Sequence, residues 1–161
     1  MPDVDAAQFR QLLGRFATGV VVVTTHLEDG TPIGMTANSL ASVSLDPPLV
    51  SLCIERQAHM HEALLRPGAG GYAINVLSEH QEALSRRFAG AHATTRFEGI
   101  GYTLSDRGLV LLDGVLATIE CTRWADYPGG DHTIVVGRVV GGGVHEGRPL
   151  CYYRGGYAAL G

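Results

Sequence analysis

The segment from Val20 to Thr25 constrains the fold of this chain most, because all six of its residues are branched at Cβ. Such side chains are stiff in a helix and pack well on a pleated surface, so the segment predicts a β-strand. The turn sequence Glu-Asp-Gly follows at 28–30, and residues 31–35 are expected to return as the partner strand. An antiparallel hairpin is therefore expected in the core.

More strands and a few helices are predicted along the chain. Short apolar or alternating segments, separated by turn residues, predict strands at 40–45, 49–54, 72–77, 102–104, 109–111, 115–124 and 132–144. Residues 127–131, Tyr-Pro-Gly-Gly-Asp, are predicted to be the loop between the last two. Many strands and only three helices favour a closed or nearly closed antiparallel barrel with the helices packed outside.

The three helices are predicted from the spacing of apolar residues. The first is amphipathic and extends from about Asp5 to Phe16, and the second lies around 60–64. Ser78 is expected to cap the third, because Gln81 follows it at the spacing of a capping box. Phe88, with Leu84, is expected on the buried face of this third helix.

The composition indicates a folded chain with few charges. Of its 161 residues, 45% are hydrophobic and 17% are charged, which excludes intrinsic disorder and suggests that another subunit covers part of the apolar surface. The net charge of −4 gives no electrostatic reason to expect nucleic acid or an anionic membrane as a partner. All 12 basic residues are arginine, so Schiff-base chemistry on a lysine is excluded.

The cysteines and the hydropathy predict a cytoplasmic protein. Cys53, Cys121 and Cys151 are far apart and odd in number, so neither a disulfide framework nor a C-x-x-C site is expected. No apolar run approaches the length of a membrane span, and no leader is apparent. We therefore expect no membrane partner.

Two local patterns resemble motifs of other functions, dinucleotide binding and metal binding, but the residues around them do not fit those motifs. Residues 68–73 have the spacing G-x-G-x-x-A of dinucleotide-binding loops, but Pro67 precedes them and a predicted strand follows, which inverts the required order. His59 and His61 would face different sides of a helix, and no third metal ligand has a recognisable spacing, so no metal is expected. No serine lies in the G-x-S-x-G pattern of hydrolases.

Polar side chains are dense between Gly34 and Leu45, in an otherwise apolar context. The hydroxyls and the one amide belong to Thr36, Asn38, Ser39, Ser42 and Ser44. Polar groups so placed must form hydrogen bonds with the protein or with a ligand. A flavin ring would suit them, because one of its edges is apolar and the other carries donors and acceptors. On chemistry alone, a strand edge whose alcohols bond to turns is an equally good interpretation.

Several motifs together resemble one family. Residues 34–39 read G-M-T-A-N-S, and S-V-S-L-D-P-P-L-V follows at 42–50. Further motifs are L-C-I-E-R, A-I-N-V-L, R-F-A-G, L-D-G, Y-P-G-G-D-H and Y-Y-R-G-G-Y, at 52–56, 73–77, 87–90, 112–114, 127–132 and 152–157. In this order, over nearly the whole chain, they resemble the flavin reductase-like family, the FMN-binding split barrel. The resemblance implies a mainly β, antiparallel split β-barrel with a few flanking helices, as one domain over residues 1–161.

The resemblance also implies which residues bind the flavin. The ring is expected to lie against the loop and strand formed by Thr36, Ala37, Asn38, Ser39, Ser42, Val43 and Ser44. The ribityl chain is expected beside Cys53, Ile54 and Glu55. The family often has a serine where this chain has Ala58, so Gln57, His59 or backbone N–H groups are expected to bind the phosphate instead.

The resemblance assigns roles to further positions. Arg87, Phe88 and Ala89 match a loop near the phosphate or adenylate end of the flavin, and a place in the helix core is the alternative for Phe88. Tyr152 is expected to close the pocket or to pack at the dimer interface. His132 matches the histidine beside the nicotinamide and is the expected catalytic residue, which orients the carboxamide rather than supplying a proton. Its alternative is a strand-start histidine bonded to the preceding aspartate.

The implied activity is hydride transfer from NADH or NADPH to FMN or FAD by a homodimer, which supplies reduced flavin to a partner monooxygenase. The chemistry is then the cofactor's, and the protein stacks the two rings about 3–3.5 Å apart. Two alternatives on the same barrel are an oxidoreductase acting on a cobalamin precursor or ferric iron, and a non-catalytic flavin-binding dimer. A module for an unrelated apolar ligand would require Asn38 and its neighbouring serines to be purely structural.

Overall fold

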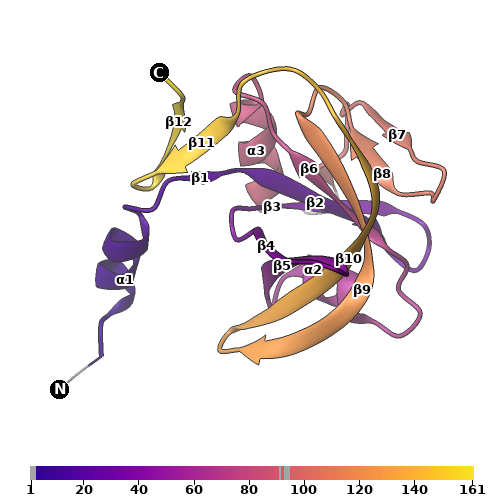
Figure 1. Ribbon diagram of the computed structural model, residues 1–161, viewed down its shortest axis with the longest axis horizontal. Coiled ribbons are helices and arrows are strands. Elements are labelled where there is room, and N and C mark those ends of the chain that lie inside the picture. Colours follow the sequence, from indigo (N-terminus) through magenta and orange to yellow (C-terminus); the bar gives the residue numbers. More distant parts are fainter. Residues whose placement is uncertain (1–2, 91, 93–94) are drawn as a thin grey trace.

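A seven-stranded antiparallel sheet forms the body of the molecule, in the order β3-β2-β6-β9-β10-β5-β4 (Figure 1). The computed structural model describes residues 3–90, 92 and 95–161. The strands of this sheet are β2 (Val21–His26), β3 (Pro32–Ala37), β4 (Ala41–Leu45), β5 (Pro48–Glu55), β6 (Tyr72–Val76), β9 (Ala117–Gly129) and β10 (His132–Val144). Its edges are β3 and β4, so the hydrogen bonding leaves the barrel split between these two strands.

Two smaller sheets complete the β structure. One contains β1 (Thr18–Gly19), β11 (Leu150–Tyr153) and β12 (Gly156–Ala159), and the other contains β7 (Tyr102–Leu104) and β8 (Val110–Leu112). The predicted mainly β, antiparallel split barrel is confirmed. The strands β1, β11 and β12 were not predicted, because they are short and their pairing joins opposite ends of the chain, as in Thr18 with Tyr152.

The run that begins at Val20 is buried on both of its faces, which explains why it lacks polar alternation. Val21 and Val23 point into the core shared with α2 (His59–Leu65), together with residues of β5 and β6. Val20 and Val22 point the other way, into a second core that contains Phe88. Because successive side chains of a strand face opposite sides, β2 serves as the common wall of two cores.

The hairpin between β9 and β10 is longer than the sequence predicts. Gly129 pairs with His132, so the turn contains only Gly130 and Asp131, and the prediction of a five-residue loop is wrong. Pro128 lies within β9, opposite Thr133. A proline is tolerated there because β6 pairs only with the Ala117–Cys121 part of β9, which leaves one side of Pro128 without a neighbouring strand.

Two of the helices depart from their predicted positions. Helix α1 (Ala6–Leu13) is shorter than predicted, with the Asp5 carboxylate accepting a hydrogen bond from Gln8 N at 2.8 Å. It has no buried residue and stands apart from the barrel instead of packing on it (Figure 1). Helix α3 (Glu82–Ala89) begins after Gln81 and not after Ser78. The Gln81 side chain accepts the Ser78 N–H at 2.9 Å, which is one of the two hydrogen bonds of the predicted capping box, but this bond closes a turn that precedes the helix. No helix in the described ranges has the length and hydropathy needed to cross a membrane.

Candidate active site

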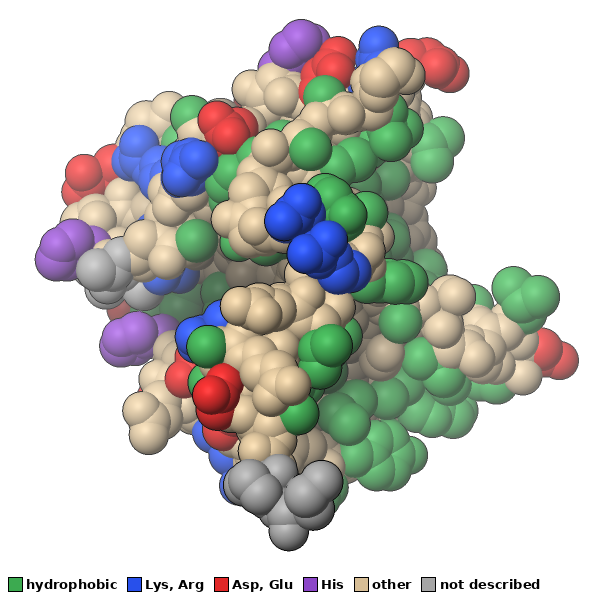
Figure 2. Space-filling model, turned by 90° about the vertical axis from the view of Figure 1, so that its left-hand side faces the viewer, with side chains coloured by type: hydrophobic (Ala, Val, Ile, Leu, Met, Phe, Trp, Pro, Cys, Tyr) green, Lys and Arg blue, Asp and Glu red, His purple; other side chains and the backbone are tan. Residues whose placement is uncertain are grey.

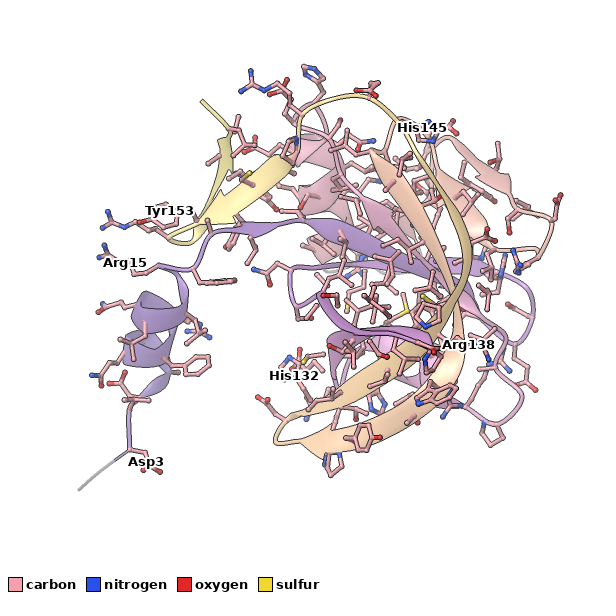
Figure 3. The ribbon with its side chains drawn as sticks, in the orientation of Figure 1. Asp3, Arg15, His132, Arg138, His145 and Tyr153 are labelled. Carbon is pink, nitrogen blue, oxygen red and sulfur yellow. The ribbon has the colours of Figure 1, made fainter. Side chains whose placement is uncertain are left out.

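A cleft of about 1110 Å³ opens between α1 and the barrel. Its walls come from α1, from residues 14–21, from the β3–β4 loop and from the turns of the β9–β10 and β11–β12 hairpins. The predicted site residues that line it are Asn38, Ser39, Cys53, His132 and Tyr152. In Figure 3, His132 faces α1 across the opening, and Tyr153 marks the β11–β12 turn at the far end of α1. The fold thus brings together residues from four separate segments.

The loop between β3 and β4 is fixed to β5 by one serine. Ser39 Oγ accepts a hydrogen bond from Cys53 N at 3.0 Å and lies 3.4 Å from Cys53 O. This hydroxyl therefore has a structural partner, as the strand-edge interpretation expects. The neighbouring Asn38 is exposed, lines the cleft and forms no side-chain hydrogen bond with any other described residue. Its amide is available to a ligand.

His132 is oriented by its neighbour in the hairpin turn. Its Nδ1 lies 2.7 Å from Asp131 Oδ1, and a carboxylate can only accept, so Nδ1 carries the proton. The hydrogen bond from His132, and then the charge attraction between the two side chains, lowers the pKa of Asp131. In the neutral ring Nε2 is then an acceptor. The expected bond to Asp131 exists, and the histidine lines the cleft as well.

The other predicted ring contacts of β3 and β4 do not line the cleft. Thr36 Oγ1 donates to Ser85 O of α3 at 2.7 Å, and Ala37 packs against the first core. Ser42 and Val43 are exposed on β4, and Ser44 is half-buried. Of the polar residues between Gly34 and Leu45, only the pair at the β3–β4 loop reaches the cleft.

The predicted ribityl and phosphate contacts also lie outside the cleft, except for Cys53. Ile54 is fully buried in the first core, whereas Glu55, Gln57 and His59 are exposed. The N–H of Ala58 donates to Glu55 O at 3.1 Å, so this backbone group already has a partner. The described residues contain no cluster of three or more His, Cys, Asp or Glu side chains that could hold a metal ion.

The R-F-A-G motif is structural in its contacts. Arg87 Nε donates to Arg96 O at 2.7 Å, and its guanidinium also bonds the carbonyls of Thr95 and Glu98. Phe88 is fully buried and packs edge-to-face on Phe97, with ring centroids 5.0 Å apart. Ala89, which completes the predicted set, is exposed. These three residues do not line the cleft, and Phe88 occupies the core position that the sequence left as its alternative.

Sequence reasoning missed the wall that α1 and the C-terminal hairpin provide. Its members include Phe9, Arg10, Leu13 and Phe16, and Arg154 at the turn between β11 and β12. The helical spacing of the apolar residues was visible in the sequence, but a pattern of this kind predicts burial. Nothing in it indicates that the row faces an open cleft.

Comparison with known proteins places the chain among flavin reductases. The model of the flavin reductase like domain matches residues 13–161. An NADH-dependent flavin reductase from Rhodococcus sp is 43% identical over 162 residues, which span 99% of this chain and 89% of that protein. A flavin-dependent monooxygenase reductase subunit from Rhodococcus jostii (strain RHA1) is 39% identical over 158 residues, with 98% and 79% covered.

A solved structure agrees with these relatives. The NADH:FAD oxidoreductase of Streptomyces globisporus C-1027, in complex with NAD and FAD fragments, superimposes with a TM-score of 0.90 at 35% identity. The match covers all of this chain and 98% of that one. The cleft, the fold and the sequence relatives agree, and the chain belongs to the flavin reductase-like family.

Proposed function

We propose that the protein is a flavin reductase that transfers hydride from NADH or NADPH to FMN or FAD. The observation that carries the proposal is one cleft lined by Asn38 and Cys53 on one side and by His132 on another. Its volume of about 1110 Å³ lies just above the roughly 300–1,000 Å³ typical of a site for one small ligand. The cleft is therefore large enough for a flavin ring.

The lining of the cleft fits a flavin. Leu40, Val21 and Val76 offer apolar surface, which suits the benzenoid part of the ring. Asn38 offers an amide that has no other described partner, and an amide can both donate to and accept from the polar edge of the ring. When bound, the flavin supplies the hydride acceptor, and the task of the protein is to align the two rings.

His132 is expected to hold the nicotinamide. With Nδ1–H donated to Asp131, its Nε2 can accept from the carboxamide N–H₂ and fix the ring's orientation. His132→Ala should therefore lower the rate of NADH-dependent reduction about ten- to a hundredfold while flavin affinity stays nearly unchanged. Stopped-flow measurement of flavin bleaching, with calorimetry for flavin binding, gives the two values. Wild-type rates in the variant would remove His132 from the site.

The reaction itself is tested by anaerobic stopped-flow with each nicotinamide and each flavin. Saturable reduction of free FMN or FAD supports the reductase. Flavin that binds but is never reduced by NADH or NADPH would contradict it and favour a non-catalytic flavin-binding dimer. Faster transfer to a cobalamin precursor than to free flavin would favour the other oxidoreductase on this barrel.

We also propose that the protein is a homodimer in which a second copy covers part of α1. Three apolar side chains of the helix, Phe9, Leu12 and Leu13, are each more than half exposed, and so is Phe16 just after the helix. An exposed apolar row of this kind is typical of an interaction surface. Leu12 belongs to the row but does not line the cleft.

Leu12→Glu should therefore weaken the dimer by at least tenfold, because one buried leucine contributes about 1.5–3 kcal/mol and the new charge must be desolvated. Sedimentation equilibrium measures the dissociation constant. Gln11→Glu, on the same exposed helix, adds the same charge and should leave the dimer intact. A wild-type monomer at micromolar concentration would contradict the proposal.

The relatives suggest the physiological setting. Because the Rhodococcus jostii relative is a monooxygenase reductase subunit, we propose that the reduced flavin is passed to a flavin-dependent monooxygenase. The family match over residues 13–161 supports one flavin reductase-like domain for the whole chain. Its cysteines Cys53, Cys121 and Cys151 are free, which supports a location in the cytoplasm.

A further inference from the structure

Two arginines give one end of the cleft a positive charge. Among the described residues, the Lys, Arg, Asp and Glu side chains that line it are Arg10, Asp131 and Arg154, and Asp131 is hydrogen-bonded to His132. The whole chain has a net charge of −4, so the lining differs in sign from the protein. In Figure 2, which views the molecule from the side of α1, arginine and hydrophobic side chains lie next to each other on this face.

These two side chains have no protein partner in the described part of the chain. Elsewhere, Arg86, Arg107, Arg123 and Arg148 form ion pairs with acidic residues, and Arg87 and Arg96 donate to backbone carbonyls. The side chains of Arg10, Arg15, Arg56, Arg66, Arg138 and Arg154 do neither. Of these six, Arg10 and Arg154 are the two that line the cleft, for which the proposed ligands are nucleotides. Guanidinium groups bind phosphate through paired, charge-assisted hydrogen bonds.

Arg154 has a backbone conformation that arginine rarely adopts, so the turn geometry does not explain why arginine occupies this position. Tyr153 pairs with Gly156, so Arg154 and Gly155 form a two-residue hairpin turn, with φ of 53° and 75°. Positive φ at both positions is the type I′ pattern, which strongly favours Asn-Gly or Gly-Gly. Arg154 is also the one non-glycine residue of the described chain with positive φ. A residue that opposes its local geometry is expected where function requires its side chain.

The turn is held against the end of α1. Arg154 N donates to Gly14 O at 2.8 Å. A Cβ at Gly14 would lie 3.5 Å from Arg154 Cα, an ordinary contact distance, so the turn lies directly against the end of the helix. This contact places the two arginine backbones on neighbouring segments at the same end of the cleft.

We propose that Arg10 and Arg154 together bind the phosphate groups of a nucleotide held in the cleft. The inference rests on the proposed function, which supplies two phosphate-bearing ligands, the flavin nucleotide and the nicotinamide dinucleotide. The turn at residues 56–59, where the resemblance places the flavin phosphate, does not line the cleft and lacks a hydroxyl at Ala58. Arg10 and Arg154 therefore provide the positive charge in the cleft, because no residue of the 56–59 turn lines it.

The test is calorimetric titration of the full-length protein with FMN, FAD, NADH and riboflavin. The variants are Arg10→Gln and Arg154→Asn. Asparagine suits the positive φ of residue 154, so the hairpin is expected to keep its fold. Each variant should bind the relevant phosphate-bearing ligand about tenfold more weakly, which corresponds to the loss of one charge-assisted hydrogen bond. Riboflavin, which has no phosphate, should bind each variant within about twofold of the wild type.

Arg138→Gln is the matched control. Arg138 is exposed and lies on the opposite side of the molecule from α1 (Figure 3). It does not line the cleft, so its variant should bind every ligand as the wild type does. A loss confined to FMN and FAD identifies the flavin phosphate as the bound group. A loss confined to NADH identifies the nicotinamide dinucleotide.

A measurement on the unaltered chain makes the test independent of variant folding. Inorganic pyrophosphate should compete with the phosphate-bearing ligand and not with riboflavin. Absence of competition would overturn the inference, as would variants that bind every ligand as tightly as Arg138→Gln or that lose riboflavin equally. Wild-type protein that binds neither flavin nor nicotinamide would instead overturn the proposed function.

Discussion

Phe88→Ala should lower the free energy of unfolding by about 3–5 kcal/mol, the usual cost of truncating a buried phenylalanine. The side chain is fully buried in the second core, against Phe97. A Cβ at Gly34 would lie only 2.7 Å from its ring, so β3 already packs on it as closely as a backbone can. Urea denaturation followed by circular dichroism measures the loss.

Phe16→Ala is the matched control for this variant. Phe16 is 73% exposed, so the same truncation should change stability by no more than about 0.5 kcal/mol. Because Phe16 lines the cleft, its variant should weaken flavin binding, whereas Phe88→Ala should leave binding by the folded fraction unchanged. A Phe88→Ala protein that is as stable as the wild type but binds flavin more weakly would contradict this prediction and show that Phe88 contributes to flavin binding.

Asn75→Leu should lower the free energy of unfolding by about 2–5 kcal/mol, because each buried polar group left unpaired costs about 1–3 kcal/mol. Asn75 has no exposed surface. Its Nδ2 donates to Val22 O at 3.0 Å and to Thr24 Oγ1 at 3.1 Å, and its Oδ1 accepts from Leu112 N at 2.9 Å. One side chain therefore connects β6 with β2 and with β8.

Asn38→Leu makes the same chemical change at an exposed residue. It should alter the urea midpoint little, within about 0.5 kcal/mol, because no described partner is lost. An Asn75→Leu midpoint equal to that of Asn38→Leu would show that the network around Asn75 contributes nothing to stability. Thermal unfolding at matched protein concentration gives an independent comparison.

The strands of the barrel could be predicted from the sequence because their signals are local. The β-branched run at Val20, the turn at Gly30 and the apolar β10 each specify their own structure. The boundaries failed where neighbours decide them, as at Pro128, which stays in a strand because one side of it has no partner strand. The strands β1 and β11 depend on each other across the whole chain, so neither has a local signal.

The candidate site could be predicted only in part, for a similar reason. Asn38 and Ser39 of the G-M-T-A-N-S motif and His132 all line the cleft. The same motif also contains Thr36, whose hydroxyl bonds to α3 instead. A linear motif does not distinguish a residue that holds the loop from one that meets the ligand. The side-chain partner makes that distinction, and it appears only in three dimensions.

The backbone contact between Gly14 and Arg154 joins two segments that are far apart in the sequence. Part of the cleft wall belongs to Tyr152, Arg154 and Gly155, and another part belongs to α1. Local unfolding of either segment would therefore remove part of the wall while the seven-stranded sheet keeps its hydrogen bonds.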